Sequence, residues 1–181
     1  MPDETARTRL SARAADYALA TMTYRYWVLL HLAGVFGLLA THGVSMVALY
    51  RVRAVAPDRE RIADTIAFSG STTTPMYVAL VVLLIGGGGA AWMGHYLNDP
   101  WIVISVAVLV LTVIAMWALA SPYFRRITAA CGIRPSGVPR VSDEELLELV
   151  RSPRAHVIST VGAIGLGIIL VLMIFKPGLG T

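Results

Sequence analysis

The sequence has little charge and almost no lysine or cysteine. Asp, Glu, Lys and Arg make up only 14% of the 181 residues, the single lysine is Lys176, and the single cysteine is Cys131. One cysteine excludes an internal disulfide, and no second Cys or His accompanies Cys131 at a spacing that binds zinc. We therefore interpret Cys131 as a free structural thiol.

The motifs of several enzyme and transporter classes are also missing. The sequence has no Gly-rich phosphate loop followed by Lys and Ser or Thr, no zinc-protease helix motif, and no Ser or Cys nucleophile with an evident orienting base. No carboxylate lies inside an apolar run, which argues against a conventional ion-coupled transporter. The net charge of +4 is explained by loop arginines beside anionic lipid and does not predict nucleic-acid binding. These absences argue against an enzyme without settling the question.

What the sequence does have is long, uncharged apolar runs. Hydrophobic residues make up 56% of the chain, more than a soluble domain of this size would bury. A helix needs about 20 apolar residues to cross a bilayer. Four segments without Asp, Glu, Lys or Arg meet this requirement, at about 27–50, 75–97, 101–120 and 156–175. The sequence therefore predicts an all-α, four-transmembrane-helix bundle that occupies residues 27–175.

The segments outside the four spans are predicted to lie at membrane surfaces. Residues 1–26 carry arginines and lack the cleavage pattern of a removable signal peptide, so we expect an interfacial helix there or, alternatively, a continuation of the first span. A second short surface helix is expected over 58–68. Ser142 and Glu145 form a capping box that opens a third, amphipathic helix, which lies on the membrane or docks a partner. Residues 176–181 form a C-terminal tail.

The distribution of arginines predicts the orientation. Positive residues near the spans are retained on the cytoplasmic side of a bacterial inner membrane. Two loops carry most of them: Arg51, Arg53, Arg59 and Arg61 in the first, and Arg125, Arg126, Arg134, Arg140, Arg151 and Arg154 in the second. Both loops are therefore predicted to be cytoplasmic, and both termini to be outside.

Rows of small residues predict where the helices touch, because helices in lipid associate through close contact. The candidate packing residues are Gly34 and Gly37 in the first span, Gly86, Gly87, Gly88 and Gly89 in the second, and Gly162 and Gly165 in the fourth. Four consecutive glycines leave space on every face of one helical turn. Either a neighbouring helix or a flat ligand approaches closely there, and tight helix crossing is the commoner reason.

The four histidines all lie in or at the ends of the predicted spans. His31 and His42 fall on nearly one face of the first helix, about 16 Å apart along its axis. The predicted topology puts His95 level with His31 and His156 level with His42. Two such pairs would suit haem b held between helices. Ligation of a single haem or of a metal by some of these residues, or ordinary hydrogen bonding, are the alternatives.

One stretch resembles known membrane families. Leu30-His31-Leu32-Ala33-Gly34-Val35-Phe36-Gly37, followed by a span that ends near Arg51 and Arg53, is similar to the first span of bacterial proteins of the copper-resistance D (CopD) type and of small integral membrane proteins of uncharacterised function. More distantly, it resembles the HemJ-type protoporphyrinogen oxidase, in which a first-span His is associated with haem, a role that would match His31 alone. The resemblance implies a four-helix membrane unit and strengthens the expectation of haem.

Three functional hypotheses follow. The first is an accessory or structural component of a bacterial inner-membrane system, working in a larger complex or as a homo-oligomer. The alternative is a small b-type haem protein that transfers electrons and uses His31 with His95 and His42 with His156. A transport or metal-handling protein is the third, although the acidic, Cys or clustered Met ligands of such proteins are missing.

Overall fold

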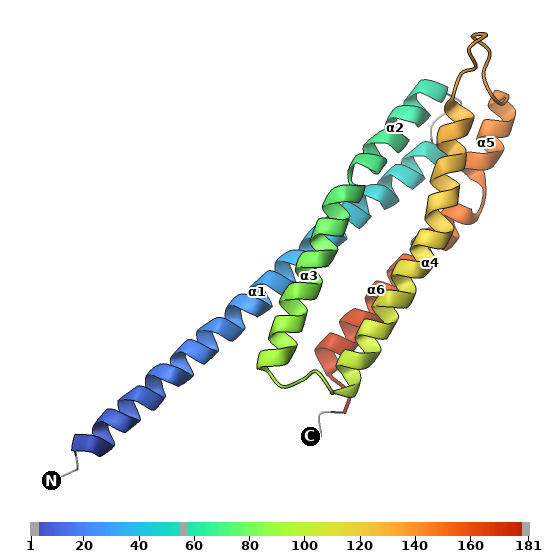
Figure 1. Cartoon of the computed structure of the whole chain (residues 1–181). Helices are drawn as coiled ribbons and strands as arrows, with labels where there is room; N and C mark the ends of the chain where they lie inside the picture. The colour runs from blue at the N-terminus through green and yellow to red at the C-terminus, as the bar shows by residue number, and fades with distance from the viewer. Residues whose placement is uncertain (1–3, 55–57, 179–181) are drawn as a thin grey trace.

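The computed structural model describes residues 4–54 and 58–178, with the side chains of 4–6 left out, and within these ranges all regular structure is helical (Figure 1). The helices are α1 (Glu4–Ala54), α2 (Arg59–Ser71), α3 (Thr73–Met93), α4 (Pro100–Cys131), α5 (Asp143–Arg151) and α6 (Arg154–Phe175). The all-α prediction is confirmed for this part of the chain.

Four helical segments are long and apolar enough to cross a membrane: Arg7–Ala54, Arg59–Met93, Pro100–Cys131 and Asp143–Phe175. Each contains one of the four predicted spans, with one difference at the end of the second. That span was expected to reach residue 97, but α3 ends at Met93, and His95 adopts the left-handed conformation with φ of 59°. The residues after Gly94 therefore form a turn into α4 rather than a last helical turn.

The helices are arranged as two antiparallel pairs. The first helix, α1, packs along α3, and α4 packs along α6, whereas contacts between the two pairs are concentrated at the end that carries α2 and α5 (Figure 1). The arginine-rich end of α1 and the connection from α4 to α5 lie at this same end. The turn from α3 to α4 and the described C-terminal residues lie at the other.

The helix α1 extends well past its partner. Its 51 residues correspond to about 76 Å at 1.5 Å per residue, far more than one bilayer crossing requires. No Gly or Pro lies between Glu4, where α1 begins, and Gly34, so nothing in that stretch of sequence stops the helix. The side chains of residues 7–23 are all exposed, and Figure 1 shows this part projecting beyond the α3–α4 turn.

The predicted N-terminal segment is thus a helical continuation of the first span. Residues 1–3 of that segment, and 179–181 of the predicted C-terminal tail, lie outside the described residues. The interfacial position of the N-terminal segment stays a prediction.

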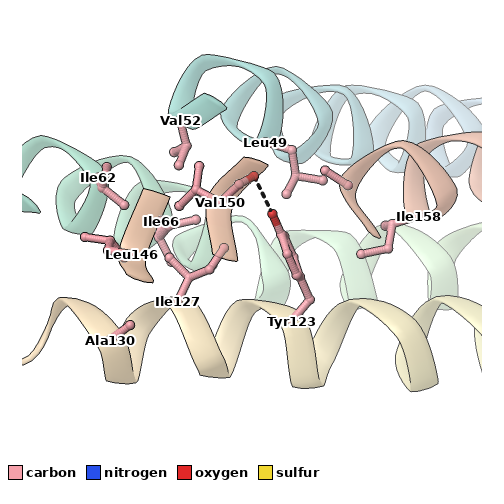
Figure 2. Close-up of a cluster of buried hydrophobic side chains, with 11 residues drawn as sticks. Leu49, Val52, Ile62, Ile66, Tyr123, Ile127, Ala130, Leu146, Val150 and Ile158 are labelled. Atoms are coloured by element: carbon pink, nitrogen blue, oxygen red, sulfur yellow. Dashed lines mark hydrogen bonds between the residues drawn. The ribbon is translucent and has the colours of Figure 1, made fainter. Parts of the chain in front are cut away.

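The buried core lies at the α2–α5 end and joins every described helix except α3 (Figure 2). It gathers side chains from α1, α2, α4, α5 and α6, with Tyr123, Ile127, Leu146 and Val150 among the most buried. The Tyr123 hydroxyl donates to the carbonyl oxygen of Val150 at 3.1 Å. The two residues that α5 contributes to this core, Leu146 and Val150, are its apolar face, so that face is occupied by the protein's own core and is not free to dock a partner.

Two arginines link neighbouring segments of the chain at the same end. Arg59 of α2 donates to the carbonyl oxygens of Ala130 at 2.5 Å and Val141 at 2.8 Å and pairs with Asp143 at 2.8 Å. Arg53 of α1 donates to the carbonyl oxygen of Ser152 at 2.5 Å. The predicted capping box of α5 is confirmed, since the Glu145 amide donates to the Ser142 hydroxyl and the Ser142 amide to the Glu145 carboxylate.

Candidate functional site: the histidines and the cavity between the helix pairs

His31 is enclosed by the glycine run of α3. Its Nδ1 donates to the carbonyl oxygen of Leu83, with a distance of 2.9 Å. A Cβ atom at Gly87 would lie 2.7 Å from this same nitrogen, and one at Gly86 would collide with the His31 backbone. The glycines therefore make room for a side chain and backbone of α1, and not for a separate ligand.

Other glycines also allow α1 and α3 to approach each other closely. A Cβ atom at Gly34 would collide with the Leu83 backbone, and one at Gly89 would overlap the ring of Trp27. At Gly37 the added atom would come within 3.0 Å of the Ala79 side chain. Gly88 differs, because it faces open space. Three of the four consecutive glycines thus serve a close crossing of two helices.

The structure does not bring His31 and His95 together. His31 is level with Gly86 and Gly87, whereas His95 follows the end of α3 about two turns farther along. It is exposed there, in the turn to α4. The expected level pairing required α3 to remain helical to residue 97 and α1 to cross it about two turns nearer its C-terminal end.

His42 and His156 are also set against different neighbours. His42 faces α6 at Gly162, where a Cβ atom would lie 2.8 Å from its Nε2. His156 is exposed near the start of α6, with its Nδ1 3.4 Å from the Tyr50 hydroxyl and the two rings 5.5 Å apart. The two histidines are therefore offset by about 9 Å along α6. The role of all four histidines as haem ligands stays a prediction.

The glycines of α6 admit side chains from two directions. At Gly162 the added Cβ would also lie 3.5 Å from the Met116 sulfur, and at Gly165 it would collide with Thr112. His42 of α1 and Met116 of α4 thus approach the same residue. The Nε2 atom of His42 has no exposed surface and no hydrogen-bond partner in the described part of the chain, and the same holds for Oγ of the nearby Ser159.

A cavity of about 1150 Å³ separates the two helix pairs and is lined by residues of α1, α2, α3, α4 and α6. His42 is the one histidine in its wall. Most of the lining is apolar, and Ser45, Ser69 and Thr72 form a hydrogen-bonded group at the junction of α1, α2 and α3, with oxygen separations of 3.3 and 3.5 Å. Apolar cavities with a few convergent polar groups are typical of ligand sites.

Sequence reasoning missed this cavity. It depends on how far the two helix pairs separate, and that distance leaves no pattern in the sequence. Cys131, which the sequence indicates only as a free structural thiol, belongs to its wall. Among the described residues no group of three or more His, Cys, Asp or Glu side chains is placed to hold a metal ion.

No protein-family model, no curated protein and no solved structure matches this chain. The fold by itself defines the class, which is a helical protein with four segments able to cross a membrane.

Proposed function

We propose that the protein is an accessory or structural component of a bacterial inner-membrane system. The observation that carries this proposal is the N-terminal part of α1. Its side chains are exposed throughout residues 7–23, and they include the large apolar side chains of Leu10, Tyr17, Leu19 and Met22. A helix of this kind gains little stability by itself in water, and its exposed apolar side chains are available for contact with the membrane or with another helix.

The N-terminal part of α1 contacts the headgroup region of the bilayer, a second copy of the chain, or a larger membrane complex. Leu10 lies among Arg7, Arg9 and Arg13, and the other large apolar side chains follow them, a composition suited to an anionic membrane surface and to partner helices alike. The resemblance to small four-helix membrane proteins agrees with this role. The orientation proposed with it has both arginine-rich loops in the cytoplasm and both termini outside.

The accessory role is tested by placing acidic residues on one face of this helix. Leu10 and Tyr17 are seven residues apart and share a face. On native gels in mild detergent we expect the wild type to run as an oligomer or complex, and we expect the variant L10D/Y17D to lose it. The matched control, S11D/A18D, adds the same charge one position along and is expected to keep it. Loss in both variants, or in neither, would count against a specific interface.

A second candidate function, a small b-type haem protein that transfers electrons, is favoured by one observation. The Nε2 atom of His42 is buried without a hydrogen-bond partner in the described residues, at the wall of a cavity of about 1150 Å³. His31, by contrast, is engaged with Leu83 and lies away from that cavity. Haem in this cavity would therefore be held by His42, with Met116, which approaches the same glycine of α6, as a possible second donor, and would supply one-electron transfer when bound.

The fit of haem at His42 is incomplete. Its Nε2 is covered by Gly162, so a bond to haem would require the imidazole to turn away from α6 into the cavity. The accessory role requires no such change, and it is therefore the function that the geometry supports best.

A further inference from the structure

The lining of the cavity changes from polar to apolar along the helices. At the α2 end, the wall contains Thr73 of α3 together with Ser121, Arg125 and Thr128 of α4. Farther toward the α3–α4 turn, the wall is made of Met76, Leu80, Leu109, Val113 and Leu166. A ligand that matches both parts has a polar head at the α2 end and an apolar body directed toward the middle of the spans.

Arg125 determines the charge of that head. It is the one charged residue in the cavity wall, and no Asp or Glu accompanies it there. The structure gives it neither an ion pair nor a hydrogen bond to the described chain, in contrast to Arg53 and Arg59, which are bound to backbone carbonyls. An unpaired guanidinium beside two hydroxyl groups is suited to a phosphate or carboxylate, to which it can donate two hydrogen bonds.

The cavity is open on its side. Tyr77 of α3 and Ile114 and Trp117 of α4 belong to its wall, yet they are 49%, 55% and 67% exposed. These two helices are joined by a turn but do not pack closely along their length (Figure 1). In a bilayer this opening faces hydrocarbon, so an occupant enters from the membrane and not from water.

We propose that this cavity binds one anionic phospholipid taken from the surrounding bilayer. Its phosphate interacts with the Arg125 guanidinium and accepts a hydrogen bond from the Ser121 hydroxyl, and its acyl chains lie against Met76, Leu80 and Val113. The cavity volume of about 1150 Å³ exceeds the range of roughly 300–1000 Å³ that is usual for drug-sized ligands, which leaves room for a lipid. With the proposed orientation, the lipid comes from the cytoplasmic leaflet, where anionic lipids attract arginine.

The chain provides a closely matched control. Arg126 neighbours Arg125, is likewise exposed and carries the same charge, but it is not part of the cavity wall. General attraction of anionic lipid to the basic end of the protein affects both arginines equally. Of these two arginines, only Arg125 is expected to contribute to binding in the cavity.

The test uses the full-length protein, delipidated in mild detergent and mixed with phosphatidylglycerol or phosphatidylcholine before native mass spectrometry. We expect one phosphatidylglycerol retained by the wild type and by R126Q, weaker retention of phosphatidylcholine, and about a tenfold loss of phosphatidylglycerol affinity in R125Q, the usual size for one charge-assisted contact. Equal losses in R125Q and R126Q, or equal retention of the two lipids, would overturn the proposal.

A second variant tests the apolar part of the cavity. M76W fills the apolar part of the cavity, on the side of Arg125 that is nearer the α3–α4 turn, without changing the charge. We expect this variant to lose retention of phosphatidylglycerol. Circular dichroism is expected to show that it remains folded. Retention unchanged in M76W would place the lipid outside the cavity and contradict the proposal. A bound mass that matches haem in place of lipid would also contradict it. Neither result depends on the N-terminal part of α1, so the accessory role is tested separately.

Discussion

His31 of α1 donates a hydrogen bond from Nδ1 to the carbonyl oxygen of Leu83 of α3, across 2.9 Å. In an uninterrupted helix that carbonyl oxygen accepts from the amide of Gly87, the residue against which the imidazole packs. A half-buried polar group in a lipid-facing bundle is satisfied by such a contact. The bond fixes the register of α1 against α3, and it explains why glycine is needed at that turn of α3.

We predict that a methyl group added at this crossing lowers the stability of the protein. The same change on the opposite face of α3 does not. In G86A the new Cβ collides with the His31 backbone, and the expected loss is about 1–3 kcal/mol of unfolding free energy, as for other overpacked sites. In G88A the methyl group enters open space and helix propensity improves slightly. Thermal unfolding in detergent, followed by circular dichroism, compares the two. Equal stability of the two variants would show that the glycines face lipid.

The histidine itself is expected to contribute to stability. Replacing His31 by Ala removes the hydrogen bond to Leu83 and leaves a gap beside Gly87, so we expect a loss of about 1–3 kcal/mol. Replacing His95, which is exposed, by Ala is expected to change little. Chemical unfolding monitored through tryptophan fluorescence measures both. A larger effect at His95 than at His31 would argue against the observed register.

Arg59 is expected to be the more important of two neighbouring arginines. Its side chain is only 15% exposed and bonds two carbonyl oxygens as well as Asp143, so R59A should cost about 1.5–3 kcal/mol. Arg61 pairs with Asp58 at 3.5 Å and is 68% exposed, and R61A should cost less than about 1 kcal/mol. The midpoint of thermal unfolding distinguishes them. A smaller loss in R59A than in R61A would contradict the view that α2 is fastened by this contact.

The orientation has its own test. A reporter fused after Arg53 is expected to be cytoplasmic, and one inserted after Asn98, in the turn between α3 and α4, is expected to be outside. Alkaline phosphatase and green fluorescent protein fusions report the two locations. A reporter found outside after Arg53 would reverse the topology and would assign the lipid site to the other leaflet.

The sequence was sufficient for the four apolar segments and for the capping box of α5, because both depend on composition and on local spacing. It left open whether the N-terminal segment continues the first span, and the structure shows one helix there because no Gly or Pro lies between Glu4 and Gly34. It did not give the end of α3 at Met93, which depends on the left-handed conformation of His95 in the turn.

The relative height of the histidines could not be obtained from spacing within one helix. It depends on the register between helices, which the contact of His31 with Gly86 and Gly87 sets. The cavity was likewise hidden, since the separation of two helix pairs is a property of their packing. Arg125 resembled the other loop arginines for the same reason: only the fold distinguishes it from Arg126.

The visible absorption spectrum of the full-length protein, purified in mild detergent from haem-replete cells and recorded oxidised and dithionite-reduced, tests the central claim most directly. An accessory component predicts a flat spectrum from folded protein. A Soret band with sharp reduced α and β bands, lost in H42L but kept in H95L, would contradict that claim and make the protein a b-type haem protein that uses His42.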